Sequence, residues 1–234
     1  MAISIFSLEK NPLYVYNSIM IITQPDRVLL NKQVATLAPE MSGVLLDIGG
    51  GPGKRYKDMF TNVSKYMVLD IEEIYKPDIV GSVEEIPMDN ESIDSILCTQ
   101  VLEHVPHPTK ALSEIFRILK PGGKALITVP QLNELHEEPR DFFRYTCFGL
   151  ETLCKEQGFR VLKMDQRGQY ASCMAQMRIR RYIDLLQPYQ NKFSMIILCP
   201  LTLIYTKIAL LIDTIDTTTS SKKHAIGWAV LLQK

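Results

Sequence analysis

The sequence lacks a net charge. Lysine and arginine together number 26, and aspartate and glutamate together also number 26. Proteins that bind the phosphate backbone of nucleic acids usually carry a basic excess. We therefore expect no nucleic-acid partner.

The sequence also lacks paired cysteines, an export signal and a metal-binding spacing. Its five cysteines are odd in number and none stands in a C-x-x-C pattern, which is typical of reduced side chains in a cytosolic protein. The first ten residues have no basic start, long apolar core or cleavage site. The four histidines lie far apart without H-x-x-x-H spacing, so the sequence predicts no metal site.

The glycine-rich residues 44–55, VLLDIGGGPGKR, fit neither of the two common phosphate-binding patterns. A dinucleotide fingerprint would need glycine at position 54, where the chain has Lys54, and no G-K-[ST] follows a four-residue spacer. The residues form D-x-G-x-G-x-G after a continuous apolar run, which predicts a strand buried on both faces. Glycines at the end of that strand allow another molecule to approach the backbone closely.

Asp70 ends the second apolar run, residues 65–71, and stands 23 positions after Asp47. In nucleotide-binding α/β units, an acid about 20 residues beyond the glycine turn binds the ribose hydroxyls. We expect Asp70 to have this role.

Helical and strand patterns alternate along the rest of the chain. This alternation predicts a mostly parallel sheet with helices on both faces, and ligands at the carboxyl ends of the strands. Further strands are predicted at residues 78–83, 92–101, 124–130, 159–164 and 228–232, and helices at 26–37, 55–63, 109–119 and 146–158.

The glycine turn and residues 92–130, SIDSILCTQVLEHVPHPTKALSEIFRILKPGGKALITVP, together resemble the motifs of class I S-adenosylmethionine-dependent methyltransferases of the type 11 group. The resemblance implies a Rossmann-like seven-stranded sheet whose last strand is antiparallel. It further implies one domain over residues 1–234, with an N-terminal helical cap at about 1–40 and a helical insertion between the sixth and seventh strands at about 166–227.

The resemblance also implies S-adenosylmethionine as the cofactor and assigns residues to it. Ser82 stands where related enzymes often have an acid, which weakens the expected adenine contact. By this resemblance, the methionine moiety would be bound by Asp47, Gly49, Gly51 and Gly53, and its amino group by the backbone near Gln100. The ribose would be bound by Asp70, and the adenine by Ile71, Ser82 and Val83.

The loop of residues 131–145, QLNELHEEPRDFFRY, is expected to roof the acceptor pocket. An oxygen acceptor benefits from a general base, for which the candidates are His104, His136 and Asp141. Arg140, Phe143 and Tyr145 are the candidate contacts to a small-molecule or glycan acceptor. The alternative for the loop is a charged solvated segment, and for His104 we favour a structural role in its turn over a catalytic one.

The insertion contains a basic segment, RIRR at 178–181, and an apolar segment at 195–212. Because Pro200 and Lys207 interrupt the apolar segment, a membrane span is disfavoured. We expect a buried or dimerising helix first, and peripheral membrane attachment through residues 178–212 second. Residues 214–223 are polar and predict a loop.

The sequence is consistent with two functions of different classes. The first is an enzyme that transfers a methyl group to a small molecule or glycan, with oxygen as the expected acceptor atom. The second is a methyltransferase-like binding subunit that keeps the pocket without turnover and acts through its insertion.

Overall fold

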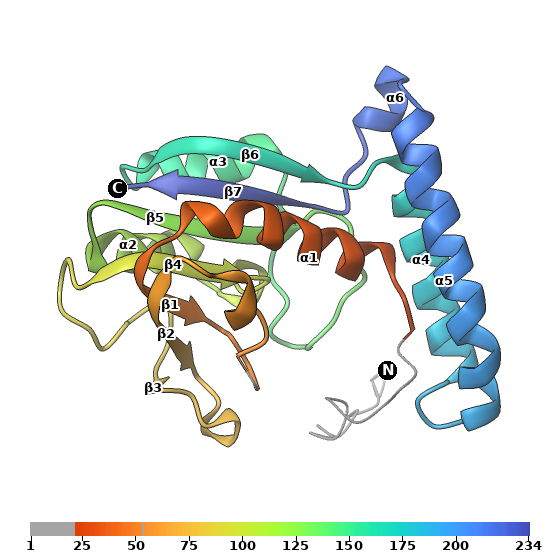
Figure 1. The fold of residues 1–234 in the computed structure, drawn as a ribbon, viewed down its shortest axis with the longest axis horizontal. Coiled ribbons are helices and arrows are strands. Elements are labelled where there is room, and N and C mark those ends of the chain that lie inside the picture. The colour runs from red at the N-terminus through yellow and green to blue at the C-terminus, as the bar shows by residue number, and fades with distance from the viewer. Residues whose placement is uncertain (1–21, 53) are drawn as a thin grey trace, which may run out of the picture.

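The computed structural model describes residues 22–52 and 54–234, so the expectations for Gly53 and for most of the N-terminal cap lie outside the described residues. One sheet runs through the molecule in the strand order β3-β2-β1-β4-β5-β7-β6 (Figure 1). The strands are β1 Gly43–Ile48, β2 Val63–Asp70, β3 Ile79–Val80, β4 Ile93–Thr99, β5 Leu119–Pro130, β6 Arg160–Arg167 and β7 Gly227–Gln233.

The pairing of these strands confirms the predicted topology. β1 pairs in parallel with both β2 and β4, so the strand order reverses at β1. β7 lies antiparallel between β5 and β6. In open α/β sheets, the point where the strand order reverses is the usual ligand-binding crevice.

The described helices are α1 Pro25–Leu37, α2 Pro108–Ile118, α3 Cys147–Glu156, α4 Tyr170–Leu186, α5 Lys192–Ile215 and α6 Thr219–Lys222, with 3-10 turns η2 Ala38–Glu40, η3 Lys57–Met59, η4 Glu73–Tyr75 and η5 Leu102–His104. The expected helix at 55–63 is thus only the turn η3, and the strand at 78–83 is only two residues long. Both segments contain too few apolar residues for a longer helix or strand to pack against the core.

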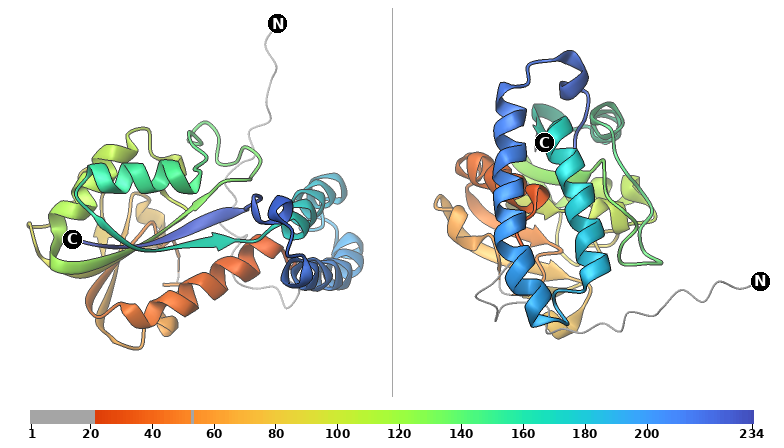
Figure 2. Two further views of the ribbon diagram at one scale, coloured as in Figure 1. Left: turned by 90° about the horizontal axis from the view of Figure 1, so that it is seen from above. Right: turned by 90° about the vertical axis from the view of Figure 1, so that its right-hand side faces the viewer.

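Each face of the sheet packs against its own hydrophobic core, because neighbouring residues of each buried strand point to opposite sides. Leu30 and Val34 of α1 pack with Leu45 of β1 on one face. Leu112 of α2 and Leu150 of α3 pack on the other face. Figure 2 shows α1 on one side of the sheet and α2 and α3 on the other.

The insertion forms a helical hairpin of α4 and α5 beyond the carboxyl ends of the parallel strands (Figures 1 and 2). Residues 214–223, expected to be a loop, contain the end of α5 and the short helix α6. The side chain of Thr218 accepts a hydrogen bond from the Ser221 N–H and caps α6, which the polar composition alone does not reveal.

The expectation of a buried apolar helix is wrong for the single chain. Only 28% of the apolar 18-residue window of α5 is buried, although the helix is long and apolar enough to cross a membrane by length and composition. One face packs against α4, and the opposite face is exposed. Its exposed side chains are Phe193, Ile196, Ile197, Leu201, Leu203, Ile204, Ile208, Leu211, Ile212 and Ile215, which we call the apolar face of α5.

Candidate cofactor and acceptor site

A cavity of about 420 Å³ lies at the carboxyl ends of β1, β4 and β5. Helices α1 and α4 and the loop that follows β5 complete its walls. It is lined by Gln24, Asp26, Arg27, Leu30, Gly49, Gly50, Gly51, Pro52, Arg55, Tyr56, Thr99, Gln100, His104, Asn133, Glu134, His136, Glu137, Gln176 and Arg180. The cavity therefore joins the glycine turn to the expected acceptor loop.

The glycine turn opens directly from β1. Gly49 and Gly51 have positive φ angles of 69° and 58°, which glycine adopts without strain. The N–H of Gly49 donates to the Leu69 carbonyl at 2.8 Å, so the turn is tied to β2. A Cβ on Gly51 would meet no atom within 4 Å, because this residue faces open space.

Asp47 lies beneath the glycine turn and does not line the cavity. It is fully buried, and its Oδ2 accepts a hydrogen bond of 2.6 Å from the Tyr66 hydroxyl. Burial raises the pKa of Asp47 to about 7, an effect that the Tyr66 hydrogen bond opposes and Asp70 adds to. The expectation of a direct contact between Asp47 and the cofactor is therefore wrong. Asp47 instead packs against Gly50 on the buried side of the turn.

Asp70 stands at the end of β2, close to the same turn. One carboxylate oxygen accepts the Gly51 N–H at 3.1 Å and the other accepts the Glu72 N–H at 2.9 Å. Its residue surface is 7% exposed. Asp70 thus fixes the shape of the turn, and it is not among the residues that line the cavity.

The three residues expected at the adenine have different environments. Ile71 is 58% exposed and is available to a ligand. Val83 packs into the core beside Leu69 and Ile86, so its expected place against an adenine ring is wrong. The hydroxyl of Ser82 accepts the Glu84 N–H at 3.1 Å and shapes its own turn.

Gln100 follows β4 and lines the cavity. Its φ of 54° is in the left-handed region, and its N–H donates to the Thr128 carbonyl at 2.9 Å. The side-chain amide donates to the Thr128 hydroxyl at 3.2 Å. These bonds hold the backbone between the glycine turn and the histidines.

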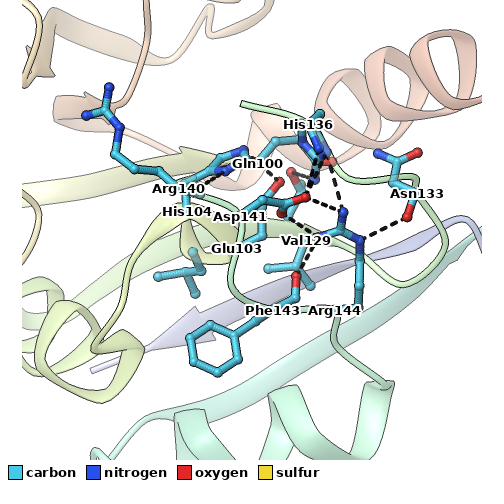
Figure 3. A network of polar contacts seen from close by, with 12 residues as sticks. Gln100, Glu103, His104, Val129, Asn133, His136, Arg140, Asp141, Phe143 and Arg144 are labelled. Atoms are coloured by element: carbon cyan, nitrogen blue, oxygen red, sulfur yellow. Dashed lines mark hydrogen bonds and ion pairs between the residues drawn. The ribbon is translucent and has the colours of Figure 1, made fainter. Parts of the chain in front are cut away.

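His104 and His136 lie side by side, although 32 positions separate them in the sequence. Their ring centroids are 4.8 Å apart in an edge-to-face arrangement of 86°, and both line the cavity. His104 comes from η5, while His136 comes from the loop after β5 (Figure 3). Two of the expected catalytic residues are thus brought together at one wall.

Asp141, the third expected base, has a structural role instead. Its two carboxylate oxygens accept hydrogen bonds of 2.6 and 2.7 Å from Arg144, and one also accepts the His136 N–H at 2.9 Å. The Arg144 hydrogen bonds lower the pKa of Asp141 to about 2. A carboxylate held this way is too weak a base to take a proton from an acceptor.

The expected acceptor contacts lie outside the cavity lining. Arg140 forms an ion pair of 3.2 Å with Glu72, and Figure 3 shows its side chain extending away from the histidines. Phe143 is 37% exposed. Tyr145 is buried and donates its hydroxyl to the Leu102 carbonyl at 2.9 Å, so its expected stacking on a substrate is wrong.

Two features of the site are absent from the sequence-based expectations. Glu103 is completely buried, and burial raises its pKa to about 8. Arg180 of α4 forms an ion pair with Glu134 of the acceptor loop, which brings the insertion into the cavity wall. The L-E-H turn and the basic RIRR segment were visible signals, but only the tertiary structure reveals what they contact.

Comparisons with known proteins agree with this geometry. Residues 46–127 match the family model described as a methyltransferase domain. Ubiquinone/menaquinone biosynthesis C-methyltransferase UbiE of Brucella canis is 30% identical over 139 residues, which cover 48% of this chain and 52% of that protein. An uncharacterized methyltransferase of Mycobacterium bovis is 34% identical over 98 residues, covering 38% of this chain and 40% of its own.

The same fold occurs in solved structures. The [4+2]-cyclase SpnF has a TM-score of 0.58 at 18% identity, with 89% of this chain and 80% of that chain covered. A SAM-dependent methyltransferase from Archaeoglobus fulgidus has a TM-score of 0.55 at 14% identity, covering 89% and 94%.

Fold and cavity together define a Rossmann-like α/β domain with a cavity at the carboxyl ends of its parallel strands. More narrowly, the match of residues 46–127 to a methyltransferase domain confirms the resemblance seen in the sequence to S-adenosylmethionine-dependent methyltransferases, whose cofactor is S-adenosylmethionine. The chain spans about half the length of the curated relatives that it matches most strongly.

Proposed function

We propose that this chain is an enzyme that transfers the methyl group of S-adenosylmethionine to an oxygen atom of a small-molecule or glycan acceptor. The observation that carries the proposal is the single cavity that joins Gly49–Gly51 to the pair His104 and His136. A methyl donor on the turn and an acceptor beside the histidines would share this space.

The chain's residues fit the donor. The open surface over Gly51 leaves room for an amino-acid tail close to the backbone. Asp70 lies next to Gly51 and offers carboxylate oxygens to a vicinal diol. When bound, S-adenosylmethionine supplies a methyl group on a sulfonium, so that a new bond to the methyl carbon forms while the electron pair of the breaking C–S bond stays on sulfur.

The walls of the cavity fit the acceptor. Placing an acceptor in line with the methyl group and excluding water supplies most of the acceleration that such a transfer needs. The loop after β5 and Arg180 of α4 close the cavity from two sides. An acceptor hydroxyl must lose a proton, and His104 and His136, which line the same cavity, are the candidates to take it.

Product analysis tests the acceptor atom. Relatives named as C-methyltransferases would form a C–CH3 bond, whereas we expect an O–CH3 bond. The intact chain is incubated with 13C-methyl S-adenosylmethionine and phenolic, hydroxy-acid and sugar acceptors. A 13C signal in the methoxy region supports an oxygen acceptor, and a signal in the aryl- or alkyl-methyl region contradicts it.

A binding subunit without turnover is the second candidate. The observation that favours it is Asp141, an expected base whose carboxylate is held by Arg144 and is too weak a base to take a proton. Tight binding of S-adenosylhomocysteine without methyl transfer to any acceptor class would support this candidate over the enzyme.

We further infer that the apolar face of α5 contacts a membrane surface. Lys207 lies exposed among its large apolar side chains. A lysine side chain can extend to the lipid headgroups at an interface, whereas a dimer interface at this face would bury its charge. The sheet strands β6 and β7, which flank the hairpin, pair with each other, which fits attachment to one side of a membrane.

A further inference from the structure

Three side chains beside the cavity offer metal-binding atoms, and two of them, His104 and His136, line it. Glu103, His104 and His136 each present one such atom, and the three atoms lie within 4.8 Å of one another. Histidine spacing in the sequence did not predict this, because His136 reaches the η5 turn only through the loop after β5. Figure 3 shows the three residues converging beside Gln100.

Glu103 is the unusual member of this group. Its residue surface is 0% exposed, and neither carboxylate oxygen has a hydrogen-bond partner among the described residues. The one basic side-chain nitrogen described within 4.0 Å of it is His104 Nε2, 3.9 Å from Oε1. A buried ionised carboxylate without partners is costly, and a bound cation would remove that cost.

His104 is oriented as a metal ligand. Its Nδ1 lies 2.6 Å from the Arg140 carbonyl oxygen. A carbonyl only accepts hydrogen bonds, so Nδ1 carries the proton. The lone pair is then on Nε2, the atom that faces Glu103.

His136 is held in the same way. Its Nδ1 lies 3.0 Å from the Glu134 carbonyl oxygen and 3.4 Å from Asp141 Oδ2. Arg144 Nη2 is also 3.4 Å away, but the shorter carbonyl contact assigns the proton to Nδ1. Carbonyl and carboxylate partners on the second nitrogen are typical of histidines that bind metals.

We propose that Glu103, His104 and His136 bind one divalent transition-metal ion on the cavity wall, with an open coordination position that receives an acceptor oxygen. Two imidazoles and one carboxylate suit Zn²⁺, Fe²⁺ or Mn²⁺. Ligand atoms at about 2.0–2.2 Å from a tetrahedral ion lie roughly 3.3–3.6 Å apart. A pair of ligand atoms 4.8 Å apart must therefore close by about 1.2 Å, which rotation of the side chains has to supply.

The ion would change the role assigned to the histidines. Bound to a metal, they are ligands and take no proton, and the ion itself lowers the pKa of an acceptor hydroxyl. The preferred acceptor would offer two adjacent oxygens, as a catechol, an enediol or a 2-hydroxy acid does. This choice of acceptor rests on the proposed methyl transfer, whereas the metal site itself does not.

Metal binding by the intact chain tests the proposal without any measurement of activity. The chain, free of a polyhistidine tag and treated with chelator, is dialysed against Zn²⁺ and, separately, titrated with Co²⁺. We expect one ion per chain and visible Co²⁺ bands of a nitrogen-ligated site. His136→Asn and Glu103→Gln should each weaken the affinity at least tenfold.

His107→Asn and His224→Asn are matched controls, because both histidines are exposed and lie outside the group. They should leave the affinity unchanged. His136, whose side chain is 27% exposed, keeps the test decisive if Glu103→Gln impairs folding. The proposal is overturned if the wild type binds no ion, or if the control variants weaken binding as much as His136→Asn.

Titration with S-adenosylhomocysteine in parallel separates this proposal from the proposed function. Cofactor binding without an ion would overturn the metal site and leave the methyltransferase intact. Ion binding that depends on His136 and Glu103, without cofactor binding, would support the metal site and contradict the methyltransferase.

Discussion

The hydroxyl of Tyr66 donates a 2.6 Å hydrogen bond to the carboxylate of Asp47 beneath the glycine turn. The other oxygen of Asp47 has no hydrogen-bond partner among the described residues. The sequence motif therefore contains a buried acid that supports the site from inside the protein.

This pair predicts a pH-dependent stability. The pKa of Asp47 is raised from 3.8 to about 7, chiefly by burial, so the folded state binds its proton more tightly than the unfolded state does. The stabilisation is present below about pH 4 and is lost as the pH rises through 7. Asp47→Asn should remove this loss, of the order of a few kcal/mol.

Urea unfolding of wild type and Asp47→Asn at pH 5 and pH 8 measures the effect. The advantage of Asp47→Asn should be larger at pH 8 than at pH 5. An equal difference at both pH values would mean that Asp47 is ionised throughout. Other carboxylates titrate alike in both proteins, so they cancel in the comparison.

Substitution of Asp141 should disturb the position of the acceptor loop and should not remove a catalytic base. Asp141→Asn removes the charge that holds Arg144, whose guanidinium also donates to the carbonyls of Asn133 and Glu134. We expect a higher KM for the acceptor and an unchanged shape of the pH–rate profile. Disappearance of an acidic limb from that profile would restore Asp141 as the base.

The ion pair of Arg180 with Glu134 joins the insertion to the acceptor loop, so we expect Arg180 to affect acceptor binding. Arg180→Ala breaks the ion pair with Glu134, an exposed contact worth about 0.2–1 kcal/mol. We expect up to about a fivefold higher KM for the acceptor. Arg181→Ala, an exposed neighbour on the same helix, is the control, and an equal effect of both variants would show that only general charge matters.

The apolar face of α5 predicts binding to lipid vesicles. The wild type should sediment with phosphatidylcholine–phosphatidylglycerol vesicles, and Ile204→Glu with Leu211→Glu should abolish this. Thr214→Glu adds a charge at an exposed polar position of the same helix and should bind as the wild type does. A concentration-dependent dimer that ignores vesicles would instead assign this face to a second copy of the chain.

The sheet could be predicted because parallel strands buried on both faces appear in the sequence as apolar runs. The number of strands and the antiparallel direction of the last one came from the family resemblance. The exposure of α5 could not be predicted, since apolar composition is the same whether a helix is covered by its own chain or by something else. Asp141 and Tyr145 were misassigned for a similar reason: sequence shows the chemistry of a side chain but not the Arg144 or Leu102 carbonyl that already uses it.

The meeting of His104 with His136 depends on long-range structure. The Phe142 and Phe143 N–H groups donate to the Glu103 carbonyl and fold the loop after β5 onto η5. No local pattern records that contact, so the histidines were predicted singly and not as a pair.

Calorimetric titration of the intact chain with S-adenosylhomocysteine tests the central claim most directly. We predict one site per chain and a loss of about 1–3 kcal/mol in binding free energy for Asp70→Ala, with Glu73→Gln, an exposed acid just beyond the same strand, binding as the wild type does. Absence of binding to the wild type, or equal affinities of wild type and Asp70→Ala, would contradict a cofactor site at the glycine turn.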